Sequence, residues 1–129
     1  MSDKKSSIVL VEDERIIALD IAQTLEYMGF DVKASFATGE DVLDYIHKNK
    51  PDLILMDIML QGCMDGIETV GKIKRIRDIP VVYMTAYTDE ETKKRANTTN
   101  PLAIIPKPVN QRKLADSLSQ FMQTDTKKL

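Results

Sequence analysis

Four short runs of consecutive apolar residues constrain the fold more than any other feature of this sequence. They lie at residues 8–11, 53–56, 81–84 and 103–105. Their lengths are typical of β-strands, and the lack of polar alternation indicates strands covered on both faces, as in a parallel sheet. A weaker, alternating run at residues 31–36 predicts a fifth strand, at an edge of that sheet.

Segments with helical periodicity separate these runs. Residues 15–28 carry Ile17, Ile21, Leu25 and Met28 on one face, and Gly29 follows as a stop signal. Further helices with a single apolar stripe are predicted at residues 39–48, 66–75 and 110–123. The elements therefore alternate strand and helix five times, and right-handed crossovers predict an α/β fold with helices on both faces of a parallel sheet.

The segment at residues 89–98 is almost devoid of apolar side chains. Its early acidic and later basic residues suit a helix dipole, so we predict a fourth helix there. With so little apolar surface to bury, this helix should be weakly anchored and among the first elements to move.

Composition limits the class of protein. The 129 residues suffice for one domain, with a core at about residues 7–123 and polar tails at 1–6 and 124–129. A net charge of -2 gives no reason to expect direct binding to nucleic acid or to a membrane. The single cysteine cannot form an internal disulfide, and no apolar run approaches the ~20 residues of a membrane span, so we expect a cytoplasmic protein.

Polar residues follow four of the predicted strands at the point where each strand ends. They are Glu12 and Asp13, then Asp57, Thr85 and Lys107. In a parallel sheet all carboxyl ends lie along one edge, where ligands of open α/β sheets bind. We therefore expect three carboxylates, one hydroxyl and one ammonium group to meet there.

Three adjacent carboxylates repel each other, by about 4 kcal/mol for each pair near 4 Å at an effective dielectric of ~20. A proton or Lys107 could compensate in part, but an all-oxygen cluster best suits Mg²⁺. Zinc is disfavoured because no Cys or His is grouped with these residues. The chemistry that fits is phosphoryl transfer onto Asp57, with Glu12 and Asp13 holding the metal.

At these residues the sequence resembles the receiver domain of two-component response regulators, from about residue 7 to 123. Five motifs stand in order and at family-like intervals: Val11-Glu12-Asp13-Glu14, Leu55-Met56-Asp57-Ile58, Met64-Asp65-Gly66-Ile67-Glu68, Met84-Thr85-Ala86 and Lys107-Pro108. The resemblance implies a stand-alone, chemotaxis-regulator-like receiver with the flavodoxin-like strand order 2-1-3-4-5.

The resemblance also implies a phosphoryl donor and a metal. A sensor histidine kinase or a histidine phosphotransfer protein would phosphorylate Asp57. Mg²⁺, or Mn²⁺ in its place, would be held by Glu12 or Asp13, by Asp57 and by the backbone carbonyl of Met59. The domain would catalyse only its own phosphorylation and dephosphorylation, and would not be an enzyme with turnover.

Lys107 and Thr85 would contact the phosphoryl oxygens, and Pro108 would follow a cis peptide bond. The output face of the family corresponds to about residues 88–122, where a downstream protein would bind. The domain itself would be a monomer or would form a phosphorylation-dependent dimer. Many receivers carry an aromatic residue three positions before the lysine, but this chain has Ile104 there.

Other functions remain open at the level of sequence. The chain could be the receiver part of a longer regulator with a DNA-binding or enzymatic output domain, or an intermediate in a phosphorelay. A Mg²⁺-dependent phosphatase with an aspartyl intermediate is a further alternative, weakened because Ile58 and Met59 occupy the positions where a second catalytic aspartate would be expected. Phosphorylation-independent scaffolding is disfavoured because the full set of acidic, Thr and Lys residues is present.

Overall fold

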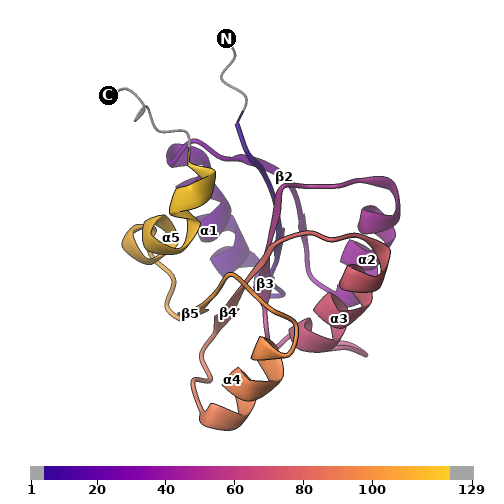
Figure 1. Cartoon of the computed structure of the whole chain (residues 1–129). Coiled ribbons are helices and arrows are strands. Elements are labelled where there is room, and N and C mark those ends of the chain that lie inside the picture. The colour runs from indigo at the N-terminus through magenta and orange to yellow at the C-terminus, as the bar shows by residue number, and fades with distance from the viewer. Residues whose placement is uncertain (1–4, 123–129) are drawn as a thin grey trace.

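A computed structural model describes residues 5–122 of the chain. Strands and helices alternate along it (Figure 1). The strands are β1 (Ser7–Val11), β2 (Asp31–Phe36), β3 (Leu53–Asp57), β4 (Val81–Thr85) and β5 (Ala103–Pro106). The helices are α1 (Arg15–Tyr27), α2 (Gly39–Lys48), α3 (Gly66–Ile76), α4 (Glu90–Asn97) and α5 (Gln111–Leu118), with a 3₁₀ turn, η1 (Ser119–Phe121), at the end.

All neighbouring strands pair in parallel, in the order β2-β1-β3-β4-β5. The expected α/β fold, strand order and edge position of residues 31–36 are therefore confirmed. The same order places residues 103–105 at the opposite edge, and Ala103 and Ile104 are only half-buried there, although the apolar run by itself predicts a strand covered on both faces. An edge strand has a single neighbour, so even an apolar sequence remains partly open there.

The core consists of two layers, one on each face of the sheet. Alternate residues of a strand point to opposite faces, so Ile8 and Leu10 of β1 contribute to one layer and Val9 and Val11 to the other. Helices α1 and α5 cover the first layer, and α2, α3 and α4 cover the second (Figure 1). β3, at the centre of the sheet, is buried along its whole length.

Helix α4 is attached very differently from the other helices. Asp89 caps its first turn by accepting a hydrogen bond from the Thr92 amide (3.0 Å). Ala96 is its one buried residue. This sparse burial agrees with the weak anchoring that the composition of residues 89–98 predicts.

The ends of the described region differ from the expected ones. The fifth helix was expected to reach residue 123, which lies outside the described residues, but α5 ends at Leu118 and η1 follows. Ser6, expected in a polar tail, is tied to the domain: its hydroxyl donates to the carbonyl of Phe121 (3.0 Å) and its carbonyl accepts from the Asp31 amide (2.9 Å). Of the predicted tails, residues 1–4 and 124–129 lie outside the described part. Within residues 5–122, no helix has the length and apolar character needed to cross a membrane.

Candidate phosphorylation site

The carboxyl ends of β1 and β3 place three acidic residues together. Asp57 is the last residue of β3, and Glu12 and Asp13 directly follow β1, its neighbour in the sheet. The position of Glu12 is fixed by its amide, which donates to the carbonyl of Phe36 on β2 (2.9 Å). Parallel pairing thus brings residues 45 positions apart to one edge, as the sequence predicts.

The three acidic side chains form a compact cluster. One carboxylate oxygen from each of Glu12, Asp13 and Asp57 lies within 4.8 Å of the other two. Glu12 and Asp57 are almost fully buried, each with 3% of its surface exposed, whereas Asp13 is partly exposed. The cluster therefore opens to solvent on the side of Asp13.

Lys107 lies between two of these carboxylates. Its amide donates to the carbonyl of Thr85 (2.8 Å), which fixes the segment after β5 beside β4, and the Lys107–Pro108 peptide bond is cis. The Lys107 ammonium group donates to Glu12 Oε1 (2.8 Å) and to Asp57 Oδ2 (3.2 Å). One positive charge thus bridges two buried negative charges.

The electrostatics of the cluster are visible in its pKa values. Burial raises the pKa of Asp57 to about 6, with a further contribution from the negative charge of Glu12, while the ion pair with Lys107 opposes the shift. Burial by itself would lower the pKa of Lys107, but its hydrogen bonds and ion pairs with Glu12 and Asp57 outweigh burial and raise it. Lys107 is therefore fully charged at neutral pH, and the cluster as a whole carries excess negative charge.

The donor set fits a hard divalent cation. Three ionised carboxylates and one ammonium group leave a formal charge of about -2, which a divalent ion would neutralise. Oxygens bound to one Mg²⁺ at about 2.0–2.1 Å lie about 3 Å apart in cis and about 4.2 Å apart in trans, so separations within 4.8 Å require only small side-chain adjustments. The buried part of the cluster contains no nitrogen or sulfur donor that would favour zinc.

The structure places the remaining predicted residues unequally. Met59 lines the same open hollow of about 310 Å³ as Asp57 and Lys107, and its amide donates to Asp57 Oδ1 (3.2 Å). Thr85 ends β4 next to β3, but its hydroxyl accepts from the Tyr87 amide (2.9 Å) and donates to the Tyr87 carbonyl (3.3 Å). Its side chain is therefore bonded to its own loop and not to the acidic cluster.

Three residues that the sequence analysis did not assign to the site lie at its rim, two of them within the motifs quoted above. Glu14, Gln61 and Ala86 line the hollow, and the Gln61 amide donates to Asp13 Oδ2 (3.0 Å). A backbone amide carries no signal in the sequence, so this contact could not have been found.

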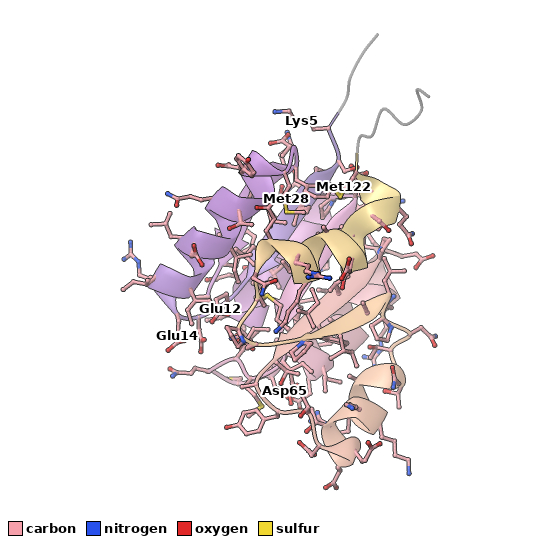
Figure 2. All side chains as sticks on the ribbon, turned by 90° about the vertical axis from the view of Figure 1, so that its left-hand side faces the viewer. Lys5, Glu12, Glu14, Met28, Asp65 and Met122 are labelled. Carbon is pink, nitrogen blue, oxygen red and sulfur yellow. The ribbon has the colours of Figure 1, made fainter. Side chains whose placement is uncertain are left out.

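Figure 2 shows Glu12, Glu14 and Asp65 toward one end of the molecule and Lys5, Met28 and Met122 toward the other.

Gly66 brings the start of α3 against the site. Its amide donates to the carbonyl of Ile58 (2.7 Å), and a Cβ at this position would overlap the carbonyl oxygen of Asp57. Asp65 precedes it as the N-cap of α3 and forms a capping box with Glu68. The spacing of Asp65 and Glu68 is a signal that sequence analysis could have used.

The fold and this acidic edge define a receiver domain. The family model of the response regulator receiver domain matches residues 8–119, so the chain belongs to this family. Receiver domains interact with kinases and with downstream output partners.

Curated and solved relatives agree with this assignment. The transcriptional regulatory protein PdtaR of Mycobacterium tuberculosis (strain CDC 1551 / Oshkosh) is 29% identical over 101 residues, which are 78% of this chain and 49% of PdtaR. The chain thus spans about half the length of that relative.

Two solved structures illustrate the similarity. The signal receiver domain of a modulated diguanylate cyclase from Desulfovibrio desulfuricans G20 is 33% identical with a TM-score of 0.84, covering 92% of this chain and 94% of that one. A CheY-like receiver domain protein from Methanospirillum hungatei JF-1 is 29% identical with a TM-score of 0.83, covering 91% and 93%.

Proposed function

We propose that this receiver accepts a phosphoryl group on Asp57 from a histidine kinase or a histidine phosphotransfer protein, in a reaction that requires Mg²⁺. The observation that carries the proposal is the position of Asp57, a buried carboxylate at the end of the central strand, in contact with both Lys107 and the acidic cluster. Mn²⁺, which also accepts oxygen ligands, should substitute for Mg²⁺.

The residues around Asp57 would divide the work. An oxygen of Asp57 would attack phosphorus as the bond to the donor's imidazole nitrogen breaks. Glu12, Asp13 and the carbonyl of Met59 would share the metal with Asp57, and the metal would neutralise charge on the transferring group. Lys107, already within 3.2 Å of Asp57, would stabilise the same charge from the other side.

Thr85 requires a conformational change to take part. Its hydroxyl now bonds to the Tyr87 backbone, and a phosphoryl oxygen near Lys107 would offer a charged acceptor in exchange. We expect Thr85 to turn inward on phosphorylation and the segment that leads to α4 to rearrange. Residues 88–122, which include α4, β5 and α5, would then present an altered surface to a downstream protein.

The phosphoryl donor would cover the rim next to α1. Ile16 and Leu19 of α1 are 84% and 59% exposed, and both line an apolar groove that shares Glu12 with the acidic site. A donor that brings a phosphohistidine to Asp57 has to cover the surface around that site, so these two side chains are suited to contact it. Leu19→Glu should slow transfer from the protein donor and leave labelling by acetyl phosphate unchanged.

The remaining functional assignments follow from this reaction. The domain would catalyse its own phosphorylation and dephosphorylation and no other turnover, and it would act in the cytoplasm. It would be a signalling module or a phosphorelay intermediate, as a single domain or as part of a longer regulator. A metal-dependent phosphatase is the less favoured reading, because Ile58 is buried and Met59 contributes an apolar side chain to the rim where a second acid would be needed.

Intact mass after incubation with acetyl phosphate tests the proposal. The wild type with Mg²⁺ should gain one phosphoryl group, and a chelator should prevent the gain. Asp57→Asn is the matched control, because it keeps the size of the side chain and removes the nucleophile. A wild-type protein that is folded and binds Mg²⁺ but gains no mass from either acetyl phosphate or a protein donor would refute phosphorylation at Asp57. Steady turnover of a phosphomonoester would favour the phosphatase.

A further inference from the structure

Helix α4 is joined to the start of α3 by an ion pair. The Arg95 guanidinium group donates to Asp65 Oδ2 (3.0 Å), while the other oxygen, Oδ1, accepts from the Glu68 amide (2.8 Å). One oxygen of Asp65 therefore caps α3 and the other holds α4. The side chain of Asp65 is 23% exposed and that of Arg95 is 48% exposed.

The α3 end of this ion pair is fixed to the phosphorylation site. Gly66 follows Asp65 and packs so closely on the backbone of Asp57 that no side chain fits there. The hydrogen bond from the Gly66 amide to the carbonyl of Ile58 holds the same contact (2.7 Å). Asp65 thus occupies a set position relative to Asp57.

The α4 end has few other attachments. Among the described residues, Ala96 is the only buried side chain of α4. Just after the helix, the hydroxyl of Thr99 shares a hydrogen bond with the hydroxyl of Tyr83 on β4 (2.7 Å). The ion pair is therefore one of the few contacts that position this helix.

Among the predicted site residues, only Thr85 makes side-chain hydrogen bonds to the segment that precedes α4. Thr85 makes two hydrogen bonds with the Tyr87 backbone, and α4 begins at Glu90. Both bonds would break if Thr85 turned toward a phosphoryl group, and α4 would then be released at its first turn. Ile104, which pairs with Tyr83 in the sheet, has no ring or polar group that could couple a movement of Thr85 to α4.

We propose that the Arg95–Asp65 ion pair restrains α4 in the position that accompanies the Thr85–Tyr87 hydrogen bonds, and that Arg95 thereby acts as a positioning residue that opposes phosphorylation. The proposal rests on the function proposed above. Movement of α4 relative to α3 would change the Arg95–Asp65 distance, because Asp65 stays fixed beside Asp57. Coupling is reciprocal, so a loss of the ion pair favours the arrangement with Thr85 turned inward.

The size of the effect follows from the exposure of the pair. A solvent-exposed ion pair shifts an equilibrium by about two- to fivefold. Arg95→Gln should therefore speed labelling of Asp57 by acetyl phosphate with Mg²⁺ by about two- to fivefold. Lys94→Gln is the matched control, because it removes the same charge from the neighbouring position of the same helix. Within the described residues, Lys94 makes no ion pair.

Two further variants test whether the ion pair itself is responsible. Asp65→Asn keeps a good N-cap for α3 and removes the charge, so it should speed labelling as Arg95→Gln does. The double variant should be no faster than either single variant, because both remove the same interaction. Arg95→Lys keeps the positive charge, so its labelling should be almost as slow as that of the wild type. In about 1 M NaCl the labelling rate of the wild type should approach that of Arg95→Gln, because salt screens the ion pair.

Hydrogen exchange distinguishes a failure of this proposal from a failure of the proposed function. Amides at the end of α4 should exchange faster in Arg95→Gln than in the wild type and in Lys94→Gln. Equal labelling rates and equal exchange would overturn the proposal, as would additive effects in the double variant. If the wild type is not labelled at all, the proposed phosphorylation fails, and exchange alone decides whether the ion pair restrains α4.

Discussion

Strand β3, which ends in Asp57, and helix α4, which follows the loop after Thr85, are held in opposite ways. All five residues of β3 are buried between two layers of core side chains. Helix α4 buries only Ala96, and its polar contacts with other elements, from Arg95 and Thr99, lie at its C-terminal end. Asp57, the proposed nucleophile, is thus carried by an element that is difficult to displace, whereas α4, part of the proposed output face, is easy to displace. Chemistry needs fixed geometry, whereas a response needs an element with small restoring forces.

Truncating one side chain to alanine in each element should give the largest difference in the free energy of unfolding. Leu55→Ala in β3 removes a fully buried side chain from the centre of the sheet and should cost about 2–5 kcal/mol of unfolding free energy. Lys94→Ala on the exposed face of α4 should change it by no more than about 0.5 kcal/mol. Urea denaturation measures both values. Similar losses for the two variants would remove the contrast between the elements.

Two glycines of α3 sharpen the comparison at the border of the site. Gly66→Ala places a methyl group against the backbone of Asp57 and should cost about 1–3 kcal/mol. Gly71→Ala, in the same helix with open space around it, should instead stabilise the protein by up to about 1 kcal/mol. The same denaturation experiment tests both signs. A tolerated Gly66→Ala would show that the α3 end can retreat from β3.

The pKa of Asp57 predicts a pH-dependent cost within the rigid region. The pKa of Asp57 is about 6 in the folded protein against an ordinary value of 3.8, so the folded state holds this proton more tightly than the unfolded chain does. The stability that results is fully present below about pH 4 and is lost as the pH rises through 6, where ionised Asp57 becomes a penalty. Asp57→Asn removes this penalty and should be more stable than the wild type by up to about 3 kcal/mol at pH 7.5 without metal, since one pKa unit corresponds to about 1.4 kcal/mol. The advantage should vanish near pH 4. Denaturation of both proteins in a chelating buffer across this range measures it, and a constant difference would exclude the assigned pKa.

Removal of the Tyr83 hydroxyl should have the smallest and most local effect. Burial raises the pKa of Tyr83 to about 12, so its hydroxyl is neutral and shares a hydrogen bond with Thr99. Tyr83→Phe should cost about 0.5–1 kcal/mol. Hydrogen exchange should increase at residues 96–99 and stay unchanged in β3. An increase spread over the sheet would mean that α4 and the core unfold as one unit.

The sequence predicted the elements of the fold and the convergence of the acidic residues for one physical reason. Uninterrupted apolar runs require a two-sided parallel sheet, and such a sheet places Glu12, Asp57 and Lys107 at a single edge. Alternation at residues 31–36 likewise revealed an edge strand. The partial exposure of Ala103 and Ile104 in β5 could not be predicted from the apolar run alone, because such a run does not tell whether a strand has one neighbour or two.

Side-chain orientation was the part that sequence could not supply. Thr85 ends β4 at the predicted edge of the sheet, but the sequence does not indicate that its hydroxyl bonds to the Tyr87 backbone. The choice depends on competing hydrogen bonds in three dimensions. The Arg95–Asp65 ion pair joins residues 30 positions apart on different helices, and the exposed acids and bases around α4 offered many equally plausible partners.

The hydrogen bond between Ser6 and Phe121 has a consequence for protein engineering. It brings the first and last described segments together (3.0 Å) at the end of the molecule away from Glu12 and Asp65 (Figure 2). A short linker between these segments, with new termini opened in an exposed loop far from Asp57, should give a circular permutant with an unaltered site. The same geometry suits fusion of a reporter at either end, because neither attachment would stand between Asp57 and an incoming donor.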